Sequence, residues 1–139
     1  FHFFIKTMEN GETISRIMQF IKSQFARRYN RMMDRTGPFW NERFTNLVVE
    51  LTADPVQTFW HVFMYVEYNP VKSKYVVDPR RYPYCGFRAY VDRDYVPPVP
   101  VTLSEYFLKL GNTDEERVAK LLEYEELYRK RIFPEGLFV

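Results

Sequence analysis

The run Tyr65-Val66-Glu67-Tyr68-Asn69-Pro70-Val71-Lys72 constrains the fold of this chain more than any other segment. The pair Asp54-Pro55 upstream is typical of a helix start, with Asp54 as the cap and Pro55 at the first helical position. Pro70 disfavours helical geometry at the residue before it. A helix is therefore predicted from about residue 55 to residue 68.

Tyr65 and Asn69 lie four residues apart at the end of this helix, so we expect their side chains on one face. A phenol needs a nearby metal or base before it attacks an electrophile. An amide oxygen suits Mg²⁺ or Mn²⁺, and His2 offers a nitrogen ligand. Each residue also has a plain interpretation: Tyr65 as a packed aromatic, Asn69 as a helix cap, and His2 as an ordinary strand residue. Glu67 is expected to face away from Tyr65 and to be solvated.

The remaining elements are predicted from apolar periodicity. Residues 1–7 are aromatic and β-prone and are predicted to form a buried strand, and a second strand is predicted at about 46–51. Apolar residues at spacings of three and four predict a helix with Thr13 or Ser15 as its cap. This helix is predicted to end at Thr36-Gly37-Pro38, with its apolar stripe in the core. Two more helices are predicted, at residues 103–110 and 114–132.

The positive charge is concentrated in one part of the chain. Residues 16–43 hold seven basic and two acidic side chains, whereas residues 101–139 hold six basic and eight acidic ones. A basic segment of this kind favours a polyanion partner, and exposed aromatic rings would suit stacking on unpaired bases. The alternative is a solvated helix face. The DNA-binding candidates are Arg16, Lys22, Arg27, Arg28, Arg31 and Arg43.

The cysteine content and the hydropathy bound the location of the chain. Cys85 is the single cysteine, which excludes an internal disulfide and fits a reducing compartment. No apolar run approaches the ~18 residues of a membrane span. We therefore predict a cytoplasmic protein without a membrane partner. The chain has no initiator methionine, and its first residues look like an interior strand, so we expect a fragment of a longer protein.

Five segments resemble, in order, motifs of one enzyme family. Phe1-His2-Phe3-Phe4-Ile5-Lys6-Thr7 resembles the second half of a "NHxHFLIKT" strand, and Tyr65 to Lys72 resembles "YIxxNPVRAG". The other three segments are ISRIMQ at 14–19 with Tyr29-Asn30, GPFWNERF at 37–44, which resembles "GxxWQxRF", and YPYCGFRAY at 82–90, which resembles "WPYSSYRAY". The family is the single-tyrosine HUH transposases, and the similarity is greatest to the REP-associated tyrosine transposases. It covers about residues 1–95.

The resemblance implies an α+β fold with a ferredoxin-like core, in which an antiparallel sheet carries helices on one face. The first strand and first helix of that core would be missing, which would leave an exposed strand edge. Residues 1–96 would form the transposase core, 97–100 a proline-rich linker, and 101–139 a helical C-terminal extension.

The resemblance also implies a function. Tyr65 would attack a DNA phosphodiester, form a 5′-phosphotyrosine link and release a 3′-hydroxyl, assisted by Mg²⁺ or Mn²⁺ on His2 and Asn69. The substrate would be single-stranded DNA beside an imperfect hairpin, and the protein would be a homodimer of bacterial type, associated with the nucleoid. The first histidine of the HUH pair would stand two residues before His2 and is not in this chain, so its own activity stays open.

Two other functions stay open. A domesticated or decayed relative would bind hairpin DNA without cutting it. Replacing Tyr65 with phenylalanine would abolish a covalent adduct if the protein transfers strands, and would change nothing if it only binds. Residues 101–139 would alternatively serve protein interaction, in which case their deletion would spare DNA binding.

Overall fold

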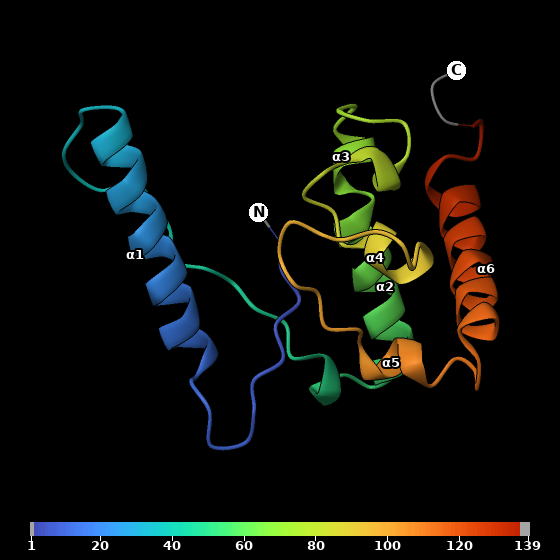
Figure 1. Cartoon of the computed structure of the whole chain (residues 1–139). Coiled ribbons are helices and arrows are strands. Elements are labelled where there is room, and N and C mark those ends of the chain that lie inside the picture. Colours follow the sequence, from blue (N-terminus) through green and yellow to red (C-terminus); the bar gives the residue numbers. More distant parts are fainter. Residues whose placement is uncertain (1, 137–139) are drawn as a thin grey trace. The chain divides into compact units, whose positions relative to one another are not determined.

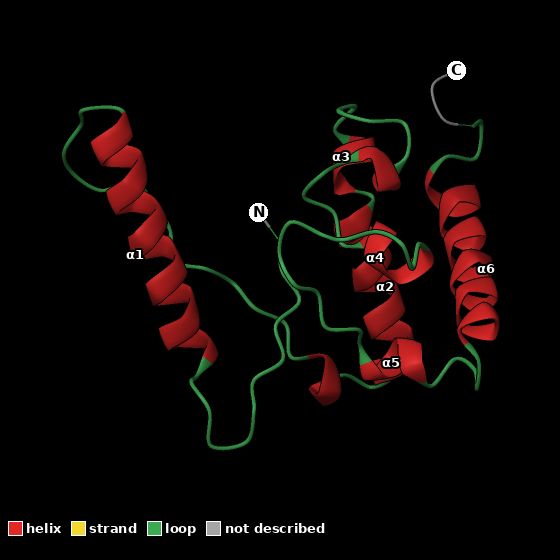
Figure 2. Ribbon diagram, in the orientation of Figure 1, coloured by secondary structure: helices red, strands yellow, loops and turns green. Residues whose placement is uncertain are grey.

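The computed structural model describes residues 2–136, and the regular structure within this range is helical (Figures 1 and 2). The helices are α1 (Ile14–Met32), α2 (Pro55–Glu67), α3 (Asn69–Lys72), α4 (Phe87–Val91), α5 (Glu105–Leu108) and α6 (Asp114–Ile132), with 3-10 turns η1 (Val49–Leu51) and η2 (Pro79–Arg81). The chain divides into two compact units, one up to Val48 and one from Val49 onward, and each is described by itself. No helix in the described range is long and apolar enough to cross a membrane.

The predicted α+β fold with its ferredoxin-like antiparallel sheet is wrong, because residues 2–136 contain no strand. The first predicted strand is irregular from residue 2 onward, and its Phe3 side chain is 53% exposed. The second ends in η1, where the backbone N–H of Thr52 donates to the carbonyl of Val49 at 3.1 Å. A β-prone segment forms a strand only where a neighbouring strand pairs with its backbone groups, and the described residues supply no such neighbour.

In the first unit, α1 begins as predicted at Thr13, whose Oγ1 accepts a hydrogen bond from the N–H of Arg16 at 3.3 Å. Its apolar stripe is less buried than predicted. Met18 is the one buried side chain on α1, and Phe25 is 46% exposed. The ring centres of Phe39 and Trp40 lie 4.9 and 5.3 Å from that of Phe25. The segment that follows α1, residues 37–44, therefore covers part of the apolar stripe.

In the second unit, α2 is the central helix, and α6 lies beside it (Figure 1). The ring of Phe59 stacks on Tyr106 at 4.4 Å, and the ring of Trp60 stacks on Tyr124 at 5.0 Å. The buried apolar residues are Phe59, Trp60, Phe63, Met64, Tyr68, Val71, Phe87, Phe107, Leu121 and Tyr128. The helices on both sides of the proline-rich segment 97–100 therefore contribute to one core.

The caps of α2 and α6 confirm the predicted starts. Asp54 Oδ1 accepts from the N–H of Gln57 at 2.9 Å, and Thr113 forms a capping box with Glu116. The end of α2 differs slightly from prediction. Tyr68 interrupts the helix with φ −87° and ψ −1°, after which α3 begins at Asn69. Pro70 is tolerated there because the first turn of a helix needs no N–H from it.

Candidate functional site

Tyr65 lies on the outer side of α2, near the C-terminal end of the helix. Its side chain is 38% exposed, whereas Met64 and Tyr68 are each 1% exposed. The ammonium nitrogen of Lys72, in α3, lies 5.1 Å from the centre of the Tyr65 ring. The Tyr65 residue is therefore partly exposed and has a cation beside its ring.

Three more side chains, one from α2 and two from α6, form a connected group with Tyr65. Arg131 Nη2 lies 2.7 Å from Nδ1 of His61, which is one helical turn before Tyr65. The same guanidinium lies 5.6 Å from the ring centre of Tyr128. Burial raises the pKa of Tyr128, the charge of Arg131 opposes that rise, and the nearby Tyr65 adds to it. We call these five residues the Tyr65 cluster: Tyr65, His61, Lys72, Tyr128 and Arg131.

Asn69, predicted as a metal ligand or as a cap, opens α3 and is half-buried. Its backbone carbonyl accepts a hydrogen bond from the N–H of Ser73 at 2.9 Å. The residue that ends α2 is Tyr68, so Asn69 begins a helical turn and does not close the preceding helix.

His2, the other predicted metal ligand, lies exposed in the irregular start of the first unit, whereas Asn69 belongs to the second. Residues 2–136 hold no group of three or more His, Cys, Asp or Glu side chains placed to share a metal ion. Mg²⁺ and Mn²⁺ prefer carboxylate and other oxygen ligands. The charged residues of the Tyr65 cluster are cations, so the residues present do not fit either metal.

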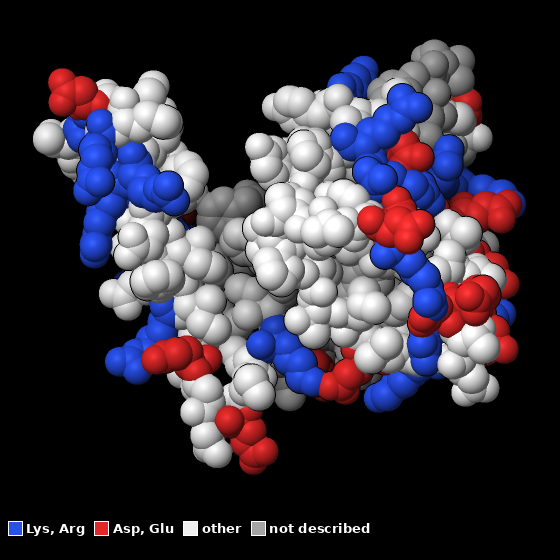
Figure 3. Space-filling view, in the orientation of Figure 1, with Lys and Arg blue, Asp and Glu red and all other residues white. Residues whose placement is uncertain are grey.

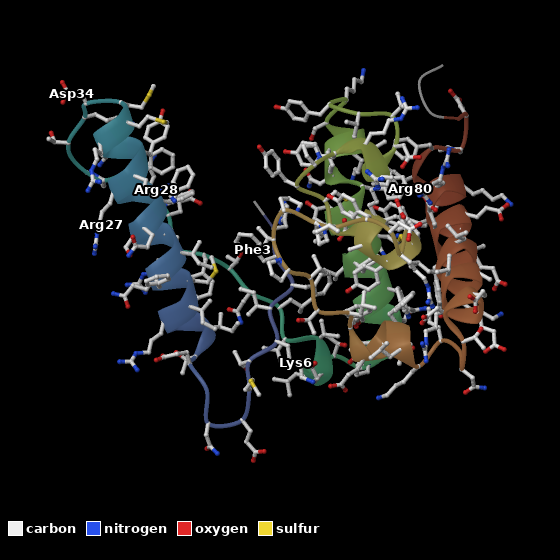
Figure 4. The ribbon with its side chains drawn as sticks, viewed as in Figure 1. Phe3, Lys6, Arg27, Arg28, Asp34 and Arg80 are labelled. Atoms are coloured by element: carbon white, nitrogen blue, oxygen red, sulfur yellow. The ribbon has the colours of Figure 1, made fainter. Side chains whose placement is uncertain are left out.

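Among the predicted DNA-binding residues, Arg27, Arg28 and Arg31 are exposed and form no ion pair with any described residue. Lys and Arg atoms gather over the C-terminal half of α1 in Figure 3, and Figure 4 labels Arg27 and Arg28 there. Phe20 is 64% exposed and lies two turns earlier. Steps of three and four residues connect Phe20 to these arginines through Gln24, so ring and charges share one side of the helix.

The other three predicted DNA-binding residues are placed differently. Arg16 pairs with Glu12 at 3.3 Å. Lys22 donates from Nζ to the carbonyl of Glu42 at 2.6 Å, and its Nζ lies 5.3 Å from the Trp40 ring centre. Lys22 therefore connects residues 37–44 to α1. Arg43 is exposed in that segment.

Glu67 was predicted to be solvated, and this is wrong, because its side chain is buried. Its Oε2 accepts from the thiol of Cys85 at 2.5 Å and from the N–H of Phe87 at 2.9 Å. Burial raises the pKa of Glu67, and the hydrogen bonds from Cys85 and from the N–H groups of Phe87 and Gly86 oppose the rise. A Cβ on Gly86 would lie 3.0 Å from Glu67 Oε1, so glycine lets this segment approach the carboxylate.

A second buried carboxylate, Glu125, holds the end of α2 against α6. Its Oε1 accepts from the hydroxyl of Tyr68 at 2.5 Å, and its Oε2 accepts from Arg80 Nη2 at 2.5 Å. Arg80, labelled in Figure 4, also donates to Asp78 at 3.0 Å. Burial raises the pKa of Tyr68, and Glu125 adds to the rise. The network connects α2 and α6, two of the three helices that carry the Tyr65 cluster.

The sequence offers a signal for some of this site and none for the rest. The motif at residues 65–72 singles out Tyr65, and Lys72 lies two helical turns after it. The contact between His61 and Arg131 joins residues 70 positions apart, and no pattern in the sequence connects them.

Comparison with known proteins finds no match for this chain: no family model fits it, and no curated protein or solved structure is significantly similar. The resemblance to the tyrosine transposases therefore depends on the five sequence segments alone. A function has to be argued from the side chains themselves.

Proposed function

We propose that this protein binds DNA with unpaired bases through one side of α1. The observation that carries the proposal is the group formed by Arg27, Arg28 and Arg31, which are exposed and have no acidic partner among the described residues. Some other surface cations of the chain are paired with acids, such as Arg88 with Asp92 at 2.9 Å.

The chemistry of this surface suits a single strand. A guanidinium binds phosphate oxygens through two parallel hydrogen bonds. The exposed ring of Phe20 on the same side would stack on a base that has no pairing partner. The preference for a strand beside a hairpin comes from the transposase resemblance and is part of the proposal.

The test is a titration of the full chain with a labelled single-stranded hairpin at several salt concentrations, followed by fluorescence anisotropy. The variant carrying Arg27→Gln, Arg28→Gln and Arg31→Gln should bind more weakly. Its slope of log K against log salt should fall by roughly 0.7 for each phosphate that the variant no longer neutralises.

The matched control carries Arg88→Gln, Lys120→Gln and Lys130→Gln, which removes the same charge from cations that have acidic partners. This variant should keep nearly all of the affinity. Equal reductions in the two triple variants would mean that the DNA responds to net charge alone, and the proposal would fail.

A second candidate function, DNA strand transfer, is favoured by the exposed phenol of Tyr65 beside Lys72. The phenol oxygen would attack the phosphorus of a phosphodiester, and the bond from phosphorus to O3′ would break. The proton that the phenol loses would pass through water to the departing oxygen, which leaves as a 3′-hydroxyl. The 5′ phosphate would remain on Tyr65.

An adduct assay tests this candidate: a denaturant-resistant band of protein linked to labelled DNA, sought with Mn²⁺, with Mg²⁺ and with chelator. Tyr65→Phe should abolish the band, and Tyr84→Phe, at a tyrosine that is 82% exposed, should keep it. A band that forms only with added metal would make the strand transfer metal-dependent. Hairpin binding without any band would leave the non-catalytic function.

The predicted homodimer also remains a proposal. It is supported by apolar side chains that stay open in the first unit, among them Met8 at 81% and Met32 at 74% exposure. Light scattering after size exclusion should give twice the mass of one chain. A mass of one chain at all concentrations would contradict it.

A further inference from the structure

The polar groups of the Tyr65 cluster all offer hydrogen-bond donors. A guanidinium can only donate, so Nδ1 of His61 must accept at its 2.7 Å contact with Arg131. The proton of the neutral imidazole is then on Nε2. Together with the ammonium of Lys72 and the guanidinium of Arg131, the imidazole gives the cluster donors from three helices.

The cluster also carries positive charge without a matching acid. Neither Lys72 nor Arg131 forms an ion pair with a described residue. Lys130, which precedes Arg131 in the sequence, pairs by contrast with Glu126 at 2.7 Å. Glu125, three residues before Tyr128, is buried and accepts hydrogen bonds from Arg80 and Tyr68.

The frame that carries these donors is fixed before any ligand arrives. The buried hydrogen bonds from Tyr68 and Arg80 to Glu125 connect α2, η2 and α6. The cation over the Tyr65 ring comes from α3, which follows α2 after a single residue. A site whose donors are held in place loses less conformational entropy when it binds.

We propose that the Tyr65 cluster binds a phosphate group, with Lys72 and Arg131 supplying the charge and His61 Nε2–H supplying a further donor. The phosphate belongs either to a nucleic-acid backbone or to a small phosphate ester. Binding here does not depend on α1. In the strand-transfer function it would hold a DNA phosphate beside the Tyr65 oxygen, and in that respect the inference extends that proposal.

The chain contains only two histidines, His2 and His61, which makes their ring protons a clean NMR readout. The full chain is titrated with inorganic phosphate, with thymidine 5′-monophosphate and with a single-stranded dinucleotide, at ionic strength held constant with chloride. The His61 signals should move with the ligand and the His2 signals should not. Lys72→Gln and Arg131→Gln should each weaken binding about tenfold.

Lys130→Gln is the matched control, because it removes the same charge from the residue next to Arg131 and should leave the affinity unchanged. A response to all three probes would indicate a general phosphate site, and a response to the dinucleotide alone would indicate a nucleic-acid backbone. Unmoved His61 signals with every probe, or an equal reduction in Lys130→Gln, would overturn the inference. The α1 triple variant should keep the His61 response, so failure of DNA binding at α1 is distinguishable from failure here.

Discussion

Cys85 and Glu67 form the closest polar contact between the end of α2 and the segment before α4, with 2.5 Å between Sγ and Oε2. Burial raises the pKa of the Cys85 thiol, and the negative charge of Glu67 raises it further. A thiol in these surroundings stays protonated and acts as a hydrogen-bond donor. The role of Cys85 is structural, because its thiol anchors the segment before α4 to the Glu67 carboxylate, which also accepts from the N–H of Phe87.

This raised pKa predicts a loss of stability at alkaline pH. The unfolded thiol ionises near pH 9.0 and the folded one does not, so the folded state binds more protons above that pH. The free energy of unfolding should therefore fall as pH rises from about 9. Cys85→Ser keeps a donor that does not ionise. The wild-type value should fall more steeply than the variant's, by up to about 1.4 kcal/mol per pH unit.

Urea unfolding of both proteins across this pH range measures the difference. The tyrosines and lysines titrate in both, so their contributions cancel in the comparison. Parallel profiles for the two proteins would show that the thiol ionises as readily in the folded state as in the unfolded one.

At the scale of elements, the sequence predicted what neighbours in the chain decide. Asp54 and Thr113 begin their helices because a cap binds N–H groups two or three residues away. The strand predicted at 1–7 depended on a partner from elsewhere in the chain, which the aromatic pattern cannot reveal. The prediction for Glu67 was wrong for the same reason, since its partners lie 18 and 20 residues further on.

The junction of α2 with α6 carries the second prediction. Glu125→Gln removes the negative charge that Arg80 and Tyr68 share, and it leaves a partly buried guanidinium without its main partner. The free energy of unfolding should fall by about 3 kcal/mol, as for other broken buried pairs. Urea unfolding followed by circular dichroism measures the change.

Glu126→Gln is the control for this variant, because the neighbouring carboxylate is exposed and pairs with Lys130 on the surface. Surface pairs contribute little, so its stability should match the wild type. If the two variants were destabilised equally, the Glu125 network would not be what holds α6 in place.

At the scale of the whole molecule, the two compact units differ in the size of their buried apolar cores. The buried apolar cluster belongs to the second unit, and α5 and α6 supply Phe107, Leu121 and Tyr128 to it. In the first unit, Met18 is the one buried apolar residue within the described range. The second unit therefore has the means to fold alone, whereas the first unit alone would be marginal.

Two fragments test this division, and their unfolding in urea is followed by near-ultraviolet circular dichroism. Residues 49–139 should unfold in one cooperative transition. Residues 49–100 should show none, because Phe59 and Trp60 lose the rings of Tyr106 and Tyr124 that stack on them. If the shorter fragment kept the transition of the longer one, α5 and α6 would be an appendage, free to serve a partner protein.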